Sequence, residues 1–171
     1  MQVVLVSDRD EVLGYKEKFE AHKNPASLHR AISVMILDPA GKLVLLQKRA
    51  AGKPTWPLFW SNTCCTHPLK DESYADCAAR RLNEEMGIEV LLKEKFRFIY
   101  EADYDGIWGE HEYDVMFEGK HTGEIKADPA EVADWKWMKV SKLLVDVKRN
   151  PQIYTPWFKI ILQKLYGLKY P

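Results

Sequence analysis

The sequence predicts one α/β domain, an α+β sandwich in which helices flank a mixed β-sheet. Three observations lead to this prediction. The chain has 171 residues, which is about the size of a single domain. Segments with strand patterns outnumber those with helical patterns, and hydrophobic residues make up 46% of the chain, enough to build a core. No internal repeat, low-complexity tract or linker divides the sequence, so we expect residues 1–171 to form one domain.

The strand predictions rest on segments rich in Val, Ile, Leu or aromatic residues, most of which are bounded by Gly, Pro or Asp. Residues 38–41, Asp-Pro-Ala-Gly, have the composition of a turn and join the second and third segments as a hairpin. The predicted strands are residues 2–6, 28–37, 43–48, 88–92, 97–102, 112–118 and 135–140.

The clearest helical segment is residues 73–86. Its small and apolar side chains recur at helical spacing, and Gly87 marks its end. At about 100° per residue, Glu85 lies at the edge of the apolar stripe, whereas Glu84 lies on the opposite side. We therefore expect Glu85 to lean toward the sheet and Glu84 toward water. From the helical pattern alone, two solvated acids, one of them paired with an arginine of the same helix, are the simpler interpretation.

A second helix is predicted at the C-terminal end, over residues 156–166. Thr155 is a candidate N-cap, Pro156 suits the first helical position, and apolar residues form one face of the segment. A shorter helix is expected over residues 141–147. These elements complete the sandwich.

Charge and cysteine content restrict the partners and the compartment. The 25 basic and 25 acidic residues cancel, which argues against a nucleic-acid or anionic-membrane partner. No apolar run approaches the roughly 18 residues that span a bilayer, and no basic region precedes the first apolar stretch as in a secretory signal. Three cysteines cannot all pair within one chain. We therefore expect a cytoplasmic protein without nucleic-acid or membrane partners.

Three acidic residues, Glu110, Glu112 and Asp114, occupy alternate positions. If this stretch is extended, their carboxylates point to one face with roughly 7 Å between successive residues, and the apolar side chains between them point to the other. Like charges so placed repel each other, and a buried face does not normally carry them. Either this face is fully wet or a cation lies on it, and the pattern alone favours the wet face.

Two further features are less common. The segment 56–62, Trp-Pro-Leu-Phe-Trp-Ser-Asn, leads into Cys64 and Cys65, and aromatic loops of this kind usually line a cavity. The alternative is a small hydrophobic cluster in which the cysteine only packs. A zinc site built on either cysteine fits poorly, because there is no C-x-x-C pair.

The second feature is the set of five histidines. A single histidine is usually structural or merely exposed, and we expect His111 and His121 to have no role in a site. His22 and His29 flank a polar segment just before a predicted strand, and His67 follows Cys65 by two residues.

Several residues resemble the Nudix box, Gx5Ex7REUxEExGU. The sequence departs from it twice, with Thr66 in place of the first Gly and Arg81 in place of the Glu after Arg. That Glu helps to hold metal in ordinary Nudix hydrolases, so its absence argues against diphosphate hydrolysis. The matching residues are Glu72, Arg80, Glu84, Glu85, Gly87 and Ile88.

The whole chain resembles the type I isopentenyl-diphosphate delta-isomerases, a branch of the Nudix superfamily. The resemblance implies a Nudix-like mixed β-sheet flanked by helices, with an N-terminal extension and a C-terminal helix. The most specific features are a Cys and a His two residues apart before a Pro. They are followed by Glu-x-Glu and Pro-Trp at the intervals found in the family. The residues that carry it are 18–22, 28–29, Arg49, 56–57, 60–62, 65–68, 80–81, 84–87, Tyr100, 110–112 and 156–157.

This resemblance implies an isomerase that interconverts isopentenyl diphosphate and dimethylallyl diphosphate, with Cys65 and Glu112 on opposite faces of the alkene. Tyr100 and Trp157 would face the developing positive charge. One divalent metal, Zn²⁺ or Mn²⁺, would bind in the acidic strand and remove the repulsion noted above. The implied ligands are His22, His29, His67, Glu110 and Glu112.

The resemblance also implies a place for the diphosphate. Glu85 would help to hold Mg²⁺ that bridges to it, and Lys18, Arg49 and Lys53 would be its cationic partners. Two other functions remain open at this point: a Nudix diphosphohydrolase, and a catalytically inactive binding module on the same scaffold.

Overall fold

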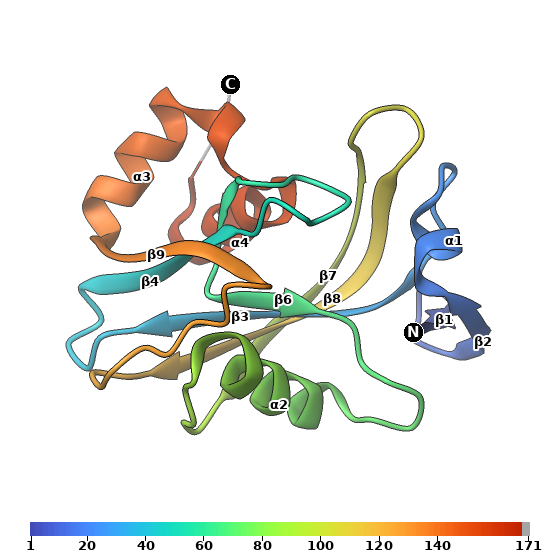
Figure 1. The fold of residues 1–171 in the computed structure, drawn as a ribbon, viewed down its shortest axis with the longest axis horizontal. Helices are drawn as coiled ribbons and strands as arrows, with labels where there is room; N and C mark the ends of the chain where they lie inside the picture. The colour runs from blue at the N-terminus through green and yellow to red at the C-terminus, as the bar shows by residue number, and fades with distance from the viewer. Residues whose placement is uncertain (169–171) are drawn as a thin grey trace.

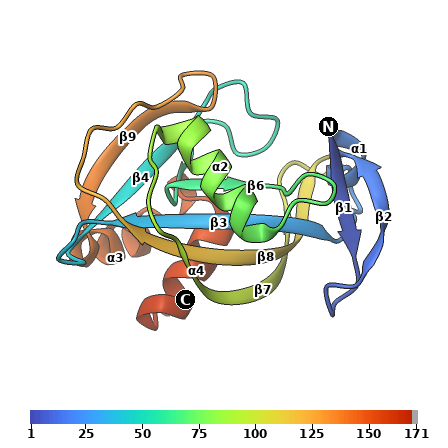
Figure 2. The ribbon, with the colours of Figure 1, turned by 90° about the horizontal axis from the view of Figure 1, so that it is seen from below.

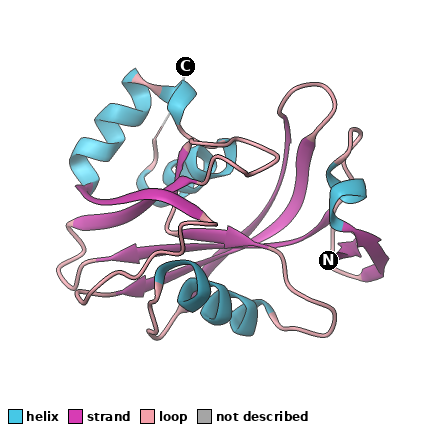
Figure 3. Cartoon of the chain, viewed as in Figure 1, coloured by secondary structure: helices cyan, strands magenta, loops and turns pink. Residues whose placement is uncertain are grey.

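The computed structural model describes residues 1–168 and contains a nine-stranded mixed sheet. Figure 1 shows the N-terminal elements at one side of the molecule and the C-terminal helices above the sheet, and Figure 3 distinguishes helices from strands. The strands are β1 Gln2–Val6, β2 Val12–Glu17, β3 His29–Leu37, β4 Leu43–Arg49, β5 Trp60–Ser61, β6 Cys64–Thr66, β7 Lys93–Asp103, β8 Gly109–Lys120 and β9 Val132–Lys139. The helices are α1 Lys18–His22, α2 Tyr74–Met86, α3 Val140–Arg149 and α4 Pro156–Tyr166, with a 3₁₀ turn at Pro151–Ile153.

Strand β3 is the centre of the sheet. It pairs in parallel with β8 over its whole length, and β8 pairs on its other side with β7 in antiparallel fashion. Along its other edge β3 meets β1, β6 and β4 in turn, each in antiparallel pairing. Strand β4 in turn pairs with β9, also in antiparallel fashion. Because β3 has neighbours on both edges and helices on both faces, it is buried almost throughout.

The helices cover both faces of the sheet. Figure 2 shows α2 over one face, with α3 and α4 behind the strands. Side chains of β3 alternate between the two cores: Val34 and Ile36 pack toward α2, whereas Met35 and Leu37 pack toward α3 and α4. The predicted sandwich, with its mixed sheet, N-terminal extension and C-terminal helix, is confirmed.

Local signals placed the main helices correctly. The Ser73 hydroxyl accepts a hydrogen bond from the Asp76 amide at the start of α2, and Gly87 ends this helix in the left-handed region, with φ of 66°. Pro156 opens α4 as predicted. Among residues 1–168, no helix combines the length and the apolar character that crossing a bilayer requires.

One predicted strand is wrong, because residues 88–92 form no strand. Ile88 is buried against α2, and the side chains of Val90 and Leu92 lie close over Gly119 of β8. The apolar side chains of this segment therefore pack onto the face of β8 and into the α2 core, and the segment does not pair as a strand. The prediction also missed β2, α1, β5 and β6, which are too short or too polar to show a clear period.

Candidate active site and metal centre

Five buried side chains from four separate segments converge near the N-terminal ends of the paired central strands β3 and β8. The atoms that could hold a metal ion all lie within 4.8 Å of one another. They come from the end of α1, the start of β3, the residue after β6, and two alternate positions of β8. They are His22, His29, His67, Glu110 and Glu112, the full set that the resemblance implies.

Strand pairing and backbone hydrogen bonds orient these side chains. The parallel register of β3 and β8 places His29 opposite Glu112. The Nδ1 atoms of His22 and His29 lie 2.7 Å from the carbonyl oxygens of Lys18 and Ser27, so each Nδ1 carries the proton. Their Nε2 lone pairs are then free to face the carboxylates, as in metal-binding histidines.

The polar contacts of this cluster fit a cation. Burial lowers the pKa of His29 to about 4 and lowers that of His67 well below its usual value, so both imidazoles are neutral. His29 Nε2 has no hydrogen-bond partner, and neither has Glu110 Oε2, although it lies 2.9 Å from His22 Nε2. Buried polar atoms are rarely left in this state unless a metal or water satisfies them. Three imidazoles and two carboxylates form a suitable set for a divalent metal.

A cavity of about 170 Å³ opens beside the cluster. Strand β6 explains which cysteine reaches it, because Cys65 pairs with Ser33 on the cavity face while its neighbour Cys64 points into the α2 core. Burial raises the pKa of the Cys65 thiol to about 12, so the thiol keeps its proton at neutral pH. The predicted residues that line this one cavity are Lys18, His22, Arg49, Lys53, Cys65, His67, Tyr100, Glu110, Glu112 and Trp157.

Two buried aromatic residues line the cavity beside Glu112. The Tyr100 hydroxyl donates a 2.6 Å hydrogen bond to Glu112 Oε2. Burial and the neighbouring Glu112 raise the pKa of Tyr100, so it remains a phenol. Trp157, in the first turn of α4, lies 6.2 Å from Tyr100 between ring centroids.

The aromatic loop has a different role from the predicted one. Trp56 packs edge-on against Trp157 with ring centroids 5.5 Å apart, and Phe59 and Trp60 join the same core without lining the cavity. The loop therefore supports the cavity wall from behind. Its backbone also holds a cation, since Arg49 donates hydrogen bonds to the carbonyl oxygens of Thr55 and Trp56.

The remaining histidines and cysteines lie outside the cluster. His111 contacts the Ala26 carbonyl oxygen and His121 is half-buried beside that of Glu124. Cys64 and Cys77 are buried in the α2 core. Sequence reasoning missed two polar supports, which had no recognisable signal: Thr55 bonds to Glu110, and the Ser33 hydroxyl bonds to Asp114.

Comparisons with known proteins show which family the chain belongs to. A family model described as the NUDIX domain matches residues 27–158. The chain is 43% identical to isopentenyl-diphosphate Delta-isomerase 2 of Aromatoleum aromaticum over 168 residues, which cover 98% of this chain and 88% of that protein. It is 42% identical to the isopentenyl-diphosphate Delta-isomerase of Nocardia farcinica, over 95% of this chain and 93% of that protein.

The chain belongs to the isopentenyl-diphosphate Delta-isomerase family of Nudix proteins. Solved structures support the fold of this isomerase-family chain. The Deinococcus radiodurans protein DR0079 superposes with a TM-score of 0.79 at 14% identity, covering 97% of this chain and 99% of that one. A MutT protein from Methanosarcina mazei reaches 0.66 at 18% identity, over 80% of this chain and 91% of that one.

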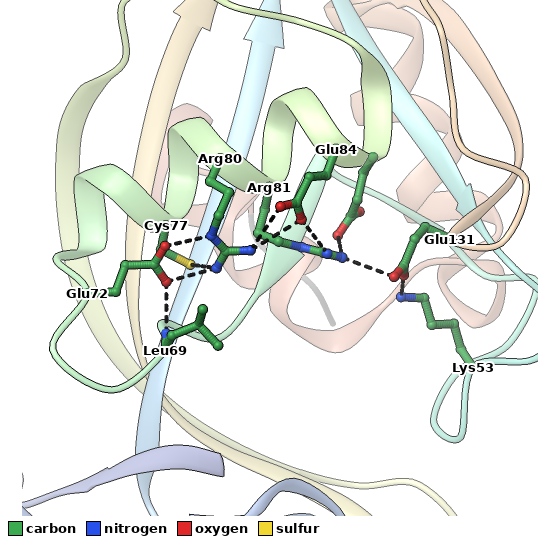
Figure 4. A network of polar contacts seen from close by, with 9 residues as sticks. Lys53, Leu69, Glu72, Cys77, Arg80, Arg81, Glu84 and Glu131 are labelled. Carbon is green, nitrogen blue, oxygen red and sulfur yellow. Dashed lines mark hydrogen bonds and ion pairs between the residues drawn. The ribbon is translucent and has the colours of Figure 1, made fainter. Parts of the chain in front are cut away.

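The Nudix box of this family member forms an ion-pair network on α2, drawn in Figure 4. Arg80 pairs with Glu72, which also accepts a hydrogen bond from the Leu69 amide. Arg81, at the position where the box has Glu, contacts Glu84. The box residues thus bind one another through the two arginines.

Glu85 lies outside the five-residue cluster. It is 1% exposed and 2.7 Å from Arg81, whereas the side chain of Glu84 is 46% exposed, as the helical pattern predicts. Burial raises the pKa of Glu85. Arg81 also reaches Glu131, which pairs with Lys53 at the cavity. A chain of ion pairs therefore connects Glu85 to the cavity wall.

Proposed function

We propose that this protein interconverts isopentenyl diphosphate and dimethylallyl diphosphate in isoprenoid biosynthesis, with a divalent metal. The observation that carries the proposal is that Cys65 and Glu112 line one cavity beside the buried cluster of three histidines and two glutamates. The curated relatives, at about 40% identity over nearly the full chain, carry the name of this activity.

The reaction moves a double bond by adding a proton to one carbon of an unactivated alkene and removing a proton from another. A protonated thiol and a carboxylate can perform these two transfers, one delivering and the other accepting. The high pKa of Cys65 and the position of Glu112 in the same cavity support this pairing. General acid–base catalysis contributes about 10²–10⁴-fold, so alignment of the alkene and exclusion of water must contribute the rest.

Positive charge develops on the alkene carbons between the two transfers. Trp157 and Tyr100 line the same cavity and would place an indole and a phenol beside this charge. A cation over a tryptophan ring is stabilised by roughly 0.5–2 kcal/mol, with the larger value in desolvated sites. Both rings are buried, which supports the larger value here.

The five-residue cluster would hold one divalent ion, Zn²⁺ or Mn²⁺, which would supply fixed positive charge beside Glu112. His22, His29, His67 and Glu110 would act only as ligands. Glu112 would act as a ligand through one oxygen and keep its other oxygen for Tyr100, an arrangement supported by the contacts of Oε1 with His67 and of Oε2 with Tyr100.

The diphosphate would bind to Lys18, Arg49 and Lys53, which line the cavity together. Burial and the neighbouring charge of Lys53 lower the pKa of Lys18, and an anionic diphosphate bound here would oppose that effect. Glu85 would share a Mg²⁺ ion with the diphosphate. Its position supports this role, because its partner Arg81, 2.7 Å away, lines the cavity. Binding the diphosphate in this way fixes the position of the double bond between Cys65 and Glu112.

We place the protein in the cytoplasm as a single domain over residues 1–171 that acts on a small diphosphate, without nucleic-acid or membrane partners. The three free thiols support a reducing compartment.

The assay that tests this function incubates the metal-loaded protein with isopentenyl diphosphate and Mg²⁺. Dimethylallyl diphosphate is the expected product. Release of phosphate instead would indicate a Nudix diphosphohydrolase, and no turnover with intact metal binding would indicate an inactive binding module. Either outcome overturns the proposal.

A further inference from the structure

A buried threonine connects the five-residue cluster to Arg49, the last residue of β4, and to the loop that follows it and carries Lys53. Thr55 lies between β4 and β5 and is 2% exposed. Its hydroxyl donates a 2.9 Å hydrogen bond to Glu110 Oε1. Its carbonyl oxygen accepts a 2.9 Å hydrogen bond from Arg49 Nη2. Thr55 therefore contacts both Glu110 of the five-residue cluster and the guanidinium of Arg49, which lines the cavity.

The hydroxyl of Thr55 binds one oxygen of the Glu110 carboxylate, and the other oxygen faces the histidines. Oε1 is occupied by the threonine donor, whereas Oε2 lies 2.9 Å from His22 Nε2 and has no hydrogen-bond partner. A carboxylate held at one oxygen by a neutral donor keeps a single orientation, with the other oxygen free as a monodentate ligand. Outer hydrogen-bond partners of this kind typically change metal affinity by about 10- to 100-fold.

We propose that Thr55 is a positioning residue for the metal centre, one that orients Glu110 and ties this orientation to Arg49 at the end of β4. The inference rests on the proposed metal centre. Of the two hydrogen bonds of Thr55, only the one to Glu110 depends on the side chain, because Arg49 binds the backbone carbonyl oxygen. A side-chain substitution therefore tests the hydroxyl alone.

The test compares Thr55→Val, which keeps the shape and removes the hydroxyl, with Thr55→Ser, which keeps the hydroxyl. Binding of Zn²⁺ and of Mn²⁺ is measured without substrate, by competition with a chromogenic chelator. We expect Thr55→Val to weaken metal binding by about 10- to 100-fold and Thr55→Ser to remain close to the parent protein. Equal metal affinity in the parent protein and Thr55→Val overturns the inference.

A second measurement separates orientation of the ligand from general stability. In the Glu110→Ala background, the acceptor of the Thr55 hydroxyl is absent, so adding Thr55→Val should cause no further loss of metal affinity. Full additivity of the two losses would mean that Thr55 acts through the fold alone, and it contradicts the proposal. Should Thr55→Val not fold, Thr55→Ala and Thr55→Ser are compared in the same two backgrounds.

Kinetics provide a third readout and keep this inference distinct from the proposed function. In Thr55→Val, isomerase activity lost at low metal concentration should return when metal is raised, with the KM for isopentenyl diphosphate nearly unchanged because Arg49 keeps its carbonyl partner. Loss of activity that saturating metal does not restore contradicts a positioning role. A protein that lacks isomerase activity but shows the Thr55→Val loss of metal binding would refute the function and retain this inference.

Discussion

The Tyr100 hydroxyl lies 2.6 Å from Glu112 Oε2, and the opposite oxygen of the same carboxylate lies 2.8 Å from His67 Nε2. One carboxylate therefore joins the five-residue cluster to the aromatic wall of the cavity. Pairing of Tyr100 with Glu112 in the register of β7 and β8 explains why the two side chains meet. Because Glu112 is buried beside Glu110, its pKa is raised, and the tyrosine donor offsets part of that cost.

Replacing Tyr100 by Phe tests this hydrogen bond. The change leaves Glu112 Oε2 without its donor, and an unsatisfied buried acceptor costs about 1–3 kcal/mol. We expect kcat to fall by at least about tenfold, with metal content unchanged because Oε1 keeps its contacts. Steady-state kinetics and elemental analysis of the purified variant measure the two quantities. An unchanged kcat would argue that the phenol has no part in catalysis.

The thiol of Cys65 is tested by replacement with Ala. Turnover should be abolished, a loss of about 10²–10⁴-fold or more from the acid–base step alone, while folding and metal content remain intact. Cys64→Ala is the matched control, because Cys64 is the adjacent buried cysteine on the opposite face of β6. It should lower the melting temperature and leave kcat close to that of the parent protein. Normal activity in Cys65→Ala would refute the assignment.

If His67 is a metal ligand as proposed, its replacement should cause a loss of metal before any other defect. His67→Ala should purify with less metal and be inactive, and excess metal should restore only part of the activity. His121→Ala serves as the comparison, since His121 lies outside the cluster. A His67→Ala protein that carries full metal and is nevertheless inactive would show that this histidine acts by another means.

The raised pKa of Cys65 predicts a distinctive pH dependence of alkylation. Because the thiol titrates near pH 12 in the metal-free protein, the reactive thiolate is a minor species at pH 8, and its fraction grows about tenfold per pH unit. Iodoacetamide labelling of the metal-free Cys64→Ser, Cys77→Ser variant should accelerate steadily from pH 7 to pH 10. A plateau near pH 8.5 would indicate an ordinary exposed thiol instead.

Several parts of the site were predictable because they are local. The alternation of Glu110 and Glu112 places both carboxylates on one face of β8 at any degree of twist, and the helical period of α2 turns Glu85 inward. The departure at Arg81 from the Nudix box is equally visible in the sequence. Each of these signals depends only on spacing along the chain.

Other parts were not predictable, because they depend on contacts between distant segments. Residues 88–92 have a strand composition, yet a strand exists only where a neighbour has free backbone groups, and composition does not encode that neighbour. The hydrogen bond from Thr55 to Glu110 spans 55 positions. No local pattern distinguishes this threonine from others in loops.

The sequence by itself determined the sandwich, the main helices, the face on which the acids of β8 lie, and through its motif the family. The family resemblance implied the five ligands, but only the tertiary structure shows how the end of α1, the start of β3 and the residue after β6 bring their imidazoles to those acids. It also decided that Glu85 pairs with Arg81. The physical reason is range: periodicity follows from bond geometry within a segment, whereas a ligand cluster depends on how strand register and core packing place segments that are far apart in the chain.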